Sequence, residues 1–241
     1  MFAVLLTVSA CSTSHPEALP TCTAGAAILT LEQAANAATV AAIGKRMGLP
    51  DHAVTIALAT ALQESKLRNL EYGDRDSLGL FQQRPSQGWG TATQVQDPRY
   101  ATAAFYRHLE RIRGWQSLPV TVAAQRVQHS AAPDAYAQWE DPARQLAKAL
   151  TGEVAAGFTC QFRPLPAPGT RTKLLEAATA ELGPGGLTRT RGPAQTWVTA
   201  SWLVAQASSY GIGTISVAGQ TWAARRGTWV ADPRAVGLVW S

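Results

Sequence analysis

Helical patterns follow one another between residues 23 and 155, and this succession most constrains the fold. Thr30 and Gln33 form a capping-box signature, and an Ala-rich stretch with apolar residues at helical spacing then runs to Arg46. No strand pattern of any length appears in this part of the chain, except around 78–82. The sequence therefore predicts a mainly helical domain.

Four further helices are expected in the same part of the chain. Asp51 is well placed to cap a helix that ends near Leu67, because its carboxylate can accept hydrogen bonds from first-turn amides. Asp97 and Pro98 open another helix. The remaining helical patterns cover residues 121–128 and 134–150, the second with a kink or break at Pro142.

A proline-rich segment, residues 164–169, interrupts the pattern. Its three prolines in five positions favour an extended spacer between domains. Beyond it the sequence predicts a small α+β domain with a tight hairpin at Arg225-Arg226-Gly227. The expected elements are helices over 172–182 and 194–210 and strands over 214–218, 221–224, 228–231 and 235–240.

The first residues resemble the export signal of a bacterial lipoprotein. Phe2 to Val8 form a short apolar run, and Val8-Ser9-Ala10-Cys11 resembles the lipobox, whose Cys receives a diacylglycerol. This resemblance implies a lipid anchor on Cys11 and a place on the outer face of the cytoplasmic membrane or in the cell wall. No Lys or Arg precedes the run, and the alternative is a cytoplasmic protein with an apolar first strand. No apolar run reaches the roughly 20 residues that span a bilayer, which excludes a polytopic transporter or channel.

Cys22 and Cys160 are the pair of cysteines that remains if Cys11 carries a lipid. They lie just outside the two ends of the helical region, and export would place them where a disulfide can form. In the chain-entropy model, closing so long a loop contributes on the order of 4 to 5 kcal/mol. We therefore expect a disulfide between them, and two unrelated buried thiols are the alternative.

The positive charge of the chain is concentrated near its C-terminal end. Residues 161–241 contain 8 Lys or Arg and 3 Asp or Glu, whereas residues 1–160 contain 13 of each. This excess predicts an anionic partner such as a wall polymer, and a solvated basic surface is the alternative. The Arg residues form no long stripe on one helix, so a nucleic acid is not expected.

Glu64 lies near the end of the helix that begins at Asp51. Apolar residues cover nearly all faces of this helix, which predicts that it is buried. Burial and the negative end of the helix dipole both disfavour the carboxylate form of Glu64. A carboxylic acid kept protonated near neutral pH is what general acid catalysis at a glycosidic oxygen needs. A solvated surface glutamate is the alternative.

The sequence around Glu64 resembles that of lysozyme-like enzymes. Glu64-Ser65 and then Gly79-Leu80-Phe81-Gln82 are similar to the E-S and G-L-M-Q signature of soluble lytic transglycosylases and goose-type lysozymes, with Phe81 in the place of Met. Gly73-Asp74-Arg75 resembles the G-D-R segment of goose-type enzymes, and the block through Gly90 is similar to lysozyme-like domains of actinobacterial secreted proteins. The resemblance covers residues 23–155 and implies a lysozyme-like fold.

The resemblance implies cleavage of the β-1,4 bond between N-acetylmuramic acid and N-acetylglucosamine in peptidoglycan. Glu64 would protonate the leaving oxygen. In a lytic transglycosylase the resulting carboxylate would take a proton from the muramic C6 hydroxyl, so that a 1,6-anhydro product forms. A hydrolase needs a second group that activates water, for which Asp74, and after it Asp76, is the candidate. Arg84 occupies about the place of another acid in goose-type enzymes, which favours the transglycosylase.

Five side chains are predicted to bind the glycan. Ser65 would contact the substrate beside the acid, Gln82 and Gln83 would hydrogen-bond acetamido groups, and Trp89 would stack on a sugar ring. Tyr136, in Ala135-Tyr136-Ala137, is the nearest match to the A-Y-N motif of lytic transglycosylases. Loop and cap hydrogen bonds, and local packing of the Trp ring, are the alternatives.

Neither a cofactor nor a metal is expected, because the four His show no ligand spacing and no Gly-rich phosphate loop is present.

The C-terminal part looks like a small domain that is appended to wall hydrolases. There it would bind the wall or act as a spacer, and Trp222 and Trp229 could present a patch to the wall. The predicted order is a signal segment over 1–10, a tether over 11–22, a lysozyme-like catalytic domain over 23–160, a linker over 161–170 and an α+β accessory domain over 171–241. The alternative function is a non-catalytic wall-binding lipoprotein that retains the fold.

Overall fold

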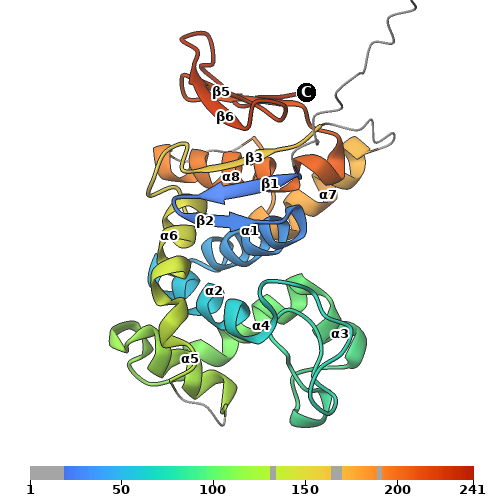
Figure 1. Cartoon of the computed structure of the whole chain (residues 1–241), viewed down its shortest axis with the longest axis vertical. Helices are drawn as coiled ribbons and strands as arrows, with labels where there is room; N and C mark the ends of the chain where they lie inside the picture. Colours follow the sequence, from blue (N-terminus) through green and yellow to red (C-terminus); the bar gives the residue numbers. More distant parts are fainter. Residues whose placement is uncertain (1–18, 131–133, 164–169, 189–191) are drawn as a thin grey trace, which may run out of the picture.

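The computed structural model describes residues 19–130, 134–163, 170–188 and 192–241 (Figure 1). These residues form a mainly helical part followed by a small α+β part, which confirms the predicted fold class at this level. The helices are α1 (Leu31–Arg46), α2 (Asp51–Ser65), α3 (Ala92–Gln96), α4 (Pro98–Glu110), α5 (Val120–Gln128), α6 (Glu140–Leu150), α7 (Thr170–Leu182) and α8 (Gly192–Tyr210). The strands are β1 (Thr21–Ala24), β2 (Ala27–Leu29), β3 (Phe158–Gln161), β4 (Thr214–Val217), β5 (Gln220–Ala223), β6 (Thr228–Ala231) and β7 (Val239–Trp240).

Two helices, α1 and α2, form the centre of the helical part. Thr30 caps α1 as predicted, because its hydroxyl accepts from the Gln33 amide at 3.2 Å while the Gln33 side chain accepts from the Thr30 amide at 2.8 Å. Every residue from Ala53 to Leu62 in α2 is buried, which confirms the expected burial of this helix. The predicted cap at Asp51 is wrong. Its carboxylate accepts from Lys45 Nζ at 2.7 Å instead, and no side chain caps α2.

A small antiparallel sheet packs against α1 and α6. Its strand order is β2-β1-β3, so the first strand of the described chain pairs with a strand that follows all six helices of the helical part. Cys22 in β1 lies opposite Cys160 in β3, and the two form the expected disulfide, with an S–S distance of 1.98 Å. The prediction that residues 23–155 contain no strand, apart from the pattern around 78–82, is wrong, because β1 and β2 occupy 21–24 and 27–29.

Three helices, α4, α5 and α6, pack around α2. Asp97 caps α4 as predicted, since its carboxylate accepts from the Arg99 amide at 2.9 Å. The helix expected over 134–150 begins only at Glu140, after a 3-10 turn, and Pro142 lies in its first turn, where proline is tolerated. The strand pattern around residues 78–82 corresponds to a single antiparallel bridge.

The C-terminal part contains the two predicted helices and one four-stranded antiparallel sheet, in the order β6-β5-β4-β7. The hairpin at 225–227 joins β5 to β6, as expected. Trp222 is fully buried, and its Nε1 donates to the Cys160 carbonyl at 3.1 Å, so an exposed patch at this residue is excluded. Trp229 is half-buried, and its Nε1 donates to the Phe158 carbonyl at 2.9 Å.

The C-terminal helices pack directly on the helical part. α1 lies against both α7 and α8 (Figure 1). Buried side chains of the two parts form one continuous hydrophobic cluster. Glu181 of α7, only 3% exposed, accepts hydrogen bonds from Arg99 Nε at 2.9 Å, Thr39 Oγ1 at 2.8 Å and Trp202 Nε1 at 2.7 Å. This buried carboxylate therefore ties α7 to α4, α1 and α8.

The predicted lipid anchor and the proline-rich spacer lie outside the described residues. The signal segment and Cys11 precede residue 19, and the prolines of the spacer fall within 164–169. Within the ranges that the structure describes, no helix combines the length and the apolar character that crossing a membrane requires.

Candidate active site

The backbone around Glu64 is held by α1. α2 ends at Ser65, and Lys66 and Leu67 both adopt left-handed backbone angles, with φ of 56° and 60°. Two side chains of α1 secure this turn: Gln33 Nε2 donates to the Lys66 carbonyl and Asn36 Nδ2 to the Leu67 carbonyl, each at 2.8 Å. These bonds satisfy carbonyl groups just beyond the helix end, where no intrahelical donor is available. The position of Glu64 thus depends on two helices.

Tyr136 meets Glu64 from the other side. The Tyr136 side chain is fully buried, and its hydroxyl donates to Glu64 Oε1 at 2.6 Å. Burial, together with the charge of Glu64, raises the pKa of Tyr136 above its usual range, so the phenol stays a donor. Glu64 itself is half-buried, and its Oε2 accepts no hydrogen bond from the described residues. One carboxyl oxygen is therefore oriented and the other is left available.

Three neighbours of this pair were not predicted from the sequence. Gln63 Oε1 accepts from Trp139 Nε1 at 2.7 Å, which joins the end of α2 to the turn before α6. The Lys66 ammonium lies over the Trp139 ring, 4.0 Å from its centroid. Burial lowers the pKa of Lys66, and the charge of Glu64 partly opposes this shift. The sequence places Gln63 directly before the acid and Trp139 three residues after Tyr136. The contact between these two side chains joins distant parts of the chain, so no local pattern predicts it.

Ser65 connects the two motifs that carry the family resemblance. Its hydroxyl is buried and donates to the Leu80 carbonyl at 2.7 Å, or alternatively to the Ala61 carbonyl at 3.1 Å. The next carbonyl, that of Phe81, accepts from Gln128 Nε2 at 2.8 Å. The segment after Gly79 is therefore fixed against α2 and α5. In this arrangement Ser65 positions the loop, and its hydroxyl is engaged within the protein.

The side chains of Gln82 and Gln83 are also engaged within the protein. Gln82 Nε2 donates to the Tyr72 carbonyl at 3.3 Å and the Gly79 carbonyl at 3.2 Å. Gln83 is 1% exposed, and its Nε2 donates to the Ala101 carbonyl at 3.0 Å. The bond from Gln82 to Tyr72 holds the loop that precedes the motif, and the bond from Gln83 ties the end of the motif to α4. Gly79 is required here, because its φ is 74° and a Cβ would lie 2.3 Å from the Val95 carbonyl oxygen in α3.

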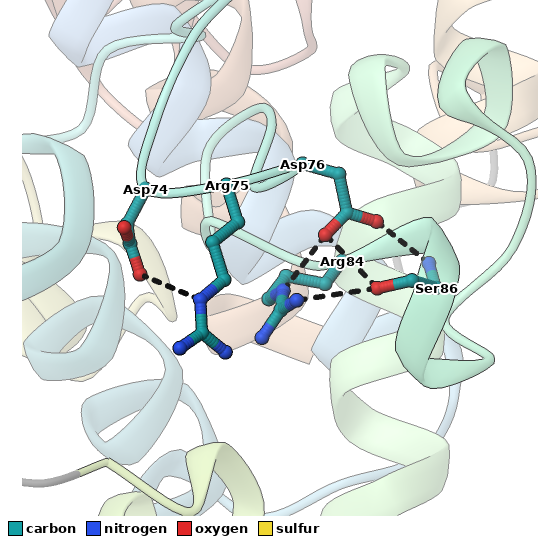
Figure 2. A network of polar contacts seen from close by, with 5 residues as sticks. All are labelled: Asp74, Arg75, Asp76, Arg84 and Ser86. Atoms are coloured by element: carbon teal, nitrogen blue, oxygen red, sulfur yellow. Dashed lines mark hydrogen bonds and ion pairs between the residues drawn. The ribbon is translucent and has the colours of Figure 1, made fainter.

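The two candidate second acids have different surroundings (Figure 2). Asp74 is 90% exposed and lies 3.9 Å from Arg75 Nε. Asp76 accepts from Arg84 Nε at 2.8 Å and from the Ser86 amide at 2.7 Å. These hydrogen bonds, that of Arg84 first, hold the pKa of Asp76 well below its usual range. Arg84 thus forms an ion pair with Asp76 that braces the loop.

Trp89 lies in the loop that follows and stacks on His108 of α4. The ring centroids are 4.0 Å apart and the rings are 20° from parallel. Burial lowers the pKa of His108, and the charges of Arg111, Arg107 and His129 act in the same direction, which favours the neutral form of the ring under Trp89. One face of the half-buried indole is therefore covered by protein.

The comparisons with known proteins identify no family for this chain. No protein-family model matches it, and no curated protein is similar to it. Within the described ranges, no group of three or more His, Cys, Asp or Glu side chains could hold a metal ion. Two pockets of about 190 Å³ and 510 Å³ are lined by residues of α1, α7, α8, β7 and adjoining loops, and Glu64 lines neither of them.

Proposed function

We propose that this chain cleaves peptidoglycan glycan strands at the β-1,4 bond between N-acetylmuramic acid and N-acetylglucosamine, as an exported lytic transglycosylase anchored through Cys11. The observation that carries the proposal is the pair of Glu64 and Tyr136: a half-buried carboxyl at the end of a buried helix, with one oxygen 2.6 Å from a buried phenol. The lysozyme-like fold that the motifs imply belongs to the same proposal.

Glu64 is suited to give and then take a proton. A general acid must be held within reach of the oxygen that it protonates. Tyr136 restricts the carboxyl group to one orientation, which reduces the entropy lost when the substrate arrives. Oε2, which accepts no hydrogen bond from the described residues, is the oxygen that would carry the proton to the leaving group.

The proposed reaction consumes no water, because the C6 hydroxyl of the muramic sugar is the acceptor. Glu64 protonates the glycosidic oxygen as its bond to muramic C1 breaks. The muramic C6 hydroxyl oxygen then bonds to C1, and the Glu64 carboxylate removes the hydroxyl proton. The acid is regenerated, and the new chain end is a 1,6-anhydro sugar.

The surroundings of the second acids support a transglycosylase over a hydrolase. An inverting hydrolase needs a carboxylate fixed so that it can activate a water molecule. Asp74 is 90% exposed, and among the described side chains its carboxylate has only a long contact with Arg75. Asp76 is occupied by Arg84 and Ser86. A mechanism with Glu64 as its single acid and base therefore agrees best with these contacts.

Digestion of purified, insoluble peptidoglycan tests the proposal. The wild type should release soluble muropeptides, whereas Glu64→Gln should release none above background. Glu71→Gln is the matched control, because Glu71 is an exposed acid in the loop that follows α2. Equal release by the wild type and Glu64→Gln would remove Glu64 from the mechanism.

A wall-binding lipoprotein without turnover is the second candidate. It is favoured by the engagement of two predicted glycan ligands: the Ser65 hydroxyl donates to the Leu80 carbonyl, and the Gln83 amide to the Ala101 carbonyl. Under this alternative the wild type sediments with insoluble peptidoglycan but releases no muropeptide. The same digestion, read in both pellet and supernatant, separates the two functions.

A further inference from the structure

A pocket of about 190 Å³ lies where the end of α1 meets the loop after α7 and the first turns of α8. α2 begins next to this end of α1 and carries Glu64 at its opposite end, so the pocket is separate from the candidate active site. Its outline comes from three elements that the buried Glu181 carboxylate ties together. The pocket is therefore formed by three packed helices together with the loop that follows α7.

The charged side chains that line the pocket are all cationic. Lys45 and Arg46, from the last turn of α1, contribute cationic side chains, and Gln195 contributes an amide. No acidic residue is among the lining residues. Lys45 Nζ also donates to Asp51 Oδ1 at 2.7 Å, whereas Arg46 forms no ion pair with any described carboxylate. The uncompensated charge in the pocket is thus that of the Arg46 guanidinium.

The rest of the lining is apolar or lacks side chains. Leu182 contributes most of the aliphatic surface, because Ala42 and Val198 are each only 2% exposed, and Gly185 and Gly186 contribute backbone. An inorganic anion would leave such aliphatic groups without a contact, whereas an organic anion with a small aliphatic body would cover them. The volume is below the roughly 300–1,000 Å³ of clefts that hold drug-sized ligands, so only a short ligand fits.

We propose that this pocket binds the free carboxyl end of a peptide that finishes in a small aliphatic residue such as alanine. The Arg46 guanidinium pairs with the terminal carboxylate, because its fork of N–H donors matches carboxylate geometry. Gln195 hydrogen-bonds the last peptide group, and the methyl side chain packs on Leu182. The inference does not depend on the proposed glycan cleavage.

Calorimetric titration of the full chain tests this site with three probes. Acetyl-Ala-Ala with a free carboxylate should bind with one-to-one stoichiometry. Its C-terminal amide, which differs only in the charged group, should bind at least roughly tenfold more weakly, since a hydrogen bond to a charged group is worth about 1.5–3 kcal/mol. Inorganic phosphate should bind no more tightly than the amide, because it offers no aliphatic body.

Two variants place the binding in this pocket. Arg46→Gln should weaken acetyl-Ala-Ala binding at least roughly tenfold. Arg113→Gln should leave it unchanged, because Arg113 is an exposed arginine outside the pocket. Equal binding of the acid and the amide, an unaltered affinity in Arg46→Gln, or phosphate binding that matches or exceeds peptide binding would each overturn the proposal, the last by showing an adventitious ion only. Glu64→Gln leaves the binding intact, so its outcome is independent of the glycan-cleaving function.

Discussion

Tyr136 and Glu64 are 72 positions apart in the chain, and the Tyr136 hydroxyl lies 2.6 Å from Glu64 Oε1. The bond joins the end of α2 to the turn that precedes α6. Nearby, Trp139 Nε1 donates to Gln63 Oε1, so two side chains of one turn hold two consecutive residues of α2. This double attachment makes the orientation of Glu64 a property of the tertiary structure rather than of its own helix.

Tyr136→Phe tests the positioning of Glu64. The ring and its packing remain, but the donor to Oε1 is lost. Because a hydrogen bond to a charged group is worth about 1.5–3 kcal/mol, we expect kcat for muropeptide release to fall roughly 10- to 100-fold with little change in KM.

Tyr106→Phe is the matched control for that variant. Tyr106 is another fully buried tyrosine, and its hydroxyl donates to the Val40 carbonyl at 3.0 Å, away from Glu64. This control should lose about 1 kcal/mol of stability and keep its kcat. If both variants lose activity equally, a general weakening of the fold explains the effect, and the positioning role is wrong.

Asp76 should make the stability of the protein depend on pH. Its pKa is lowered in the folded chain, by Arg84 first and then by Ser86, so its contribution is present above its unfolded pKa of about 3.9 and is lost as pH falls below that value. At pH 7, Asp76→Asn should therefore melt at a lower temperature than the wild type. The gap should narrow as pH falls from about 4 downward.

Asp74→Asn serves as the comparison in those melting curves. Asp74 is 90% exposed, so the melting temperature of the Asp74→Asn variant should match that of the wild type at every pH. A gap between Asp76→Asn and the wild type that stays constant down to the lowest pH would show that the Asp76 charge does not brace the loop.

Glu181 should couple the C-terminal helices to the rest of the fold. Glu181→Gln replaces an acceptor of three hydrogen bonds by a group that also brings donors, next to the buried Trp202 N–H and the Thr39 hydroxyl. We expect a loss of about 2–3 kcal/mol in the free energy of unfolding. Denaturant curves measure it, with Glu176→Gln, an exposed acid on the same helix, as the control. Equal curves for the two variants would rule out this coupling.

The disulfide should contribute strongly to stability. It links residues 138 positions apart, and removal of a native disulfide typically costs about 2–5 kcal/mol. Cys22→Ser combined with Cys160→Ser should therefore unfold at lower denaturant concentration than the wild type, and a reducing agent should shift the wild type to the same midpoint. An unchanged midpoint under reduction would mean that the bond carries no stability.

Local signals were sufficient to predict most helices. The capping box of Thr30 and Gln33 and the cap at Asp97 depend on residues within three positions of each other, so the sequence alone identifies them. Asp51 shows where such reasoning fails. Its carboxylate could accept from the first amides of α2 or from the Lys45 ammonium, six positions earlier in the chain. In the structure it accepts from Lys45.

Elements that depend on distant partners were not predictable in the same way. β1 pairs with β2 and with β3, and β3 lies near residue 160, so the partner that holds β1 in the sheet is far away in the sequence. The sequence suggests that Trp222 belongs to a surface patch, yet the residue is fully buried and its N–H donates to the Cys160 carbonyl in β3. Tyr136 was identified only through its resemblance to a motif, and its partner Glu64 required the tertiary structure.

The chain ends of the released glycan test the central claim most directly. Mass spectrometry of soluble products should find 1,6-anhydromuramic ends after digestion by the wild type and none after digestion by Glu64→Gln. Reducing muramic ends from the wild type would instead mean that water is the acceptor, which would contradict a single glutamate acting as acid and base. Anhydro ends from both proteins would contradict any role of Glu64 in the reaction.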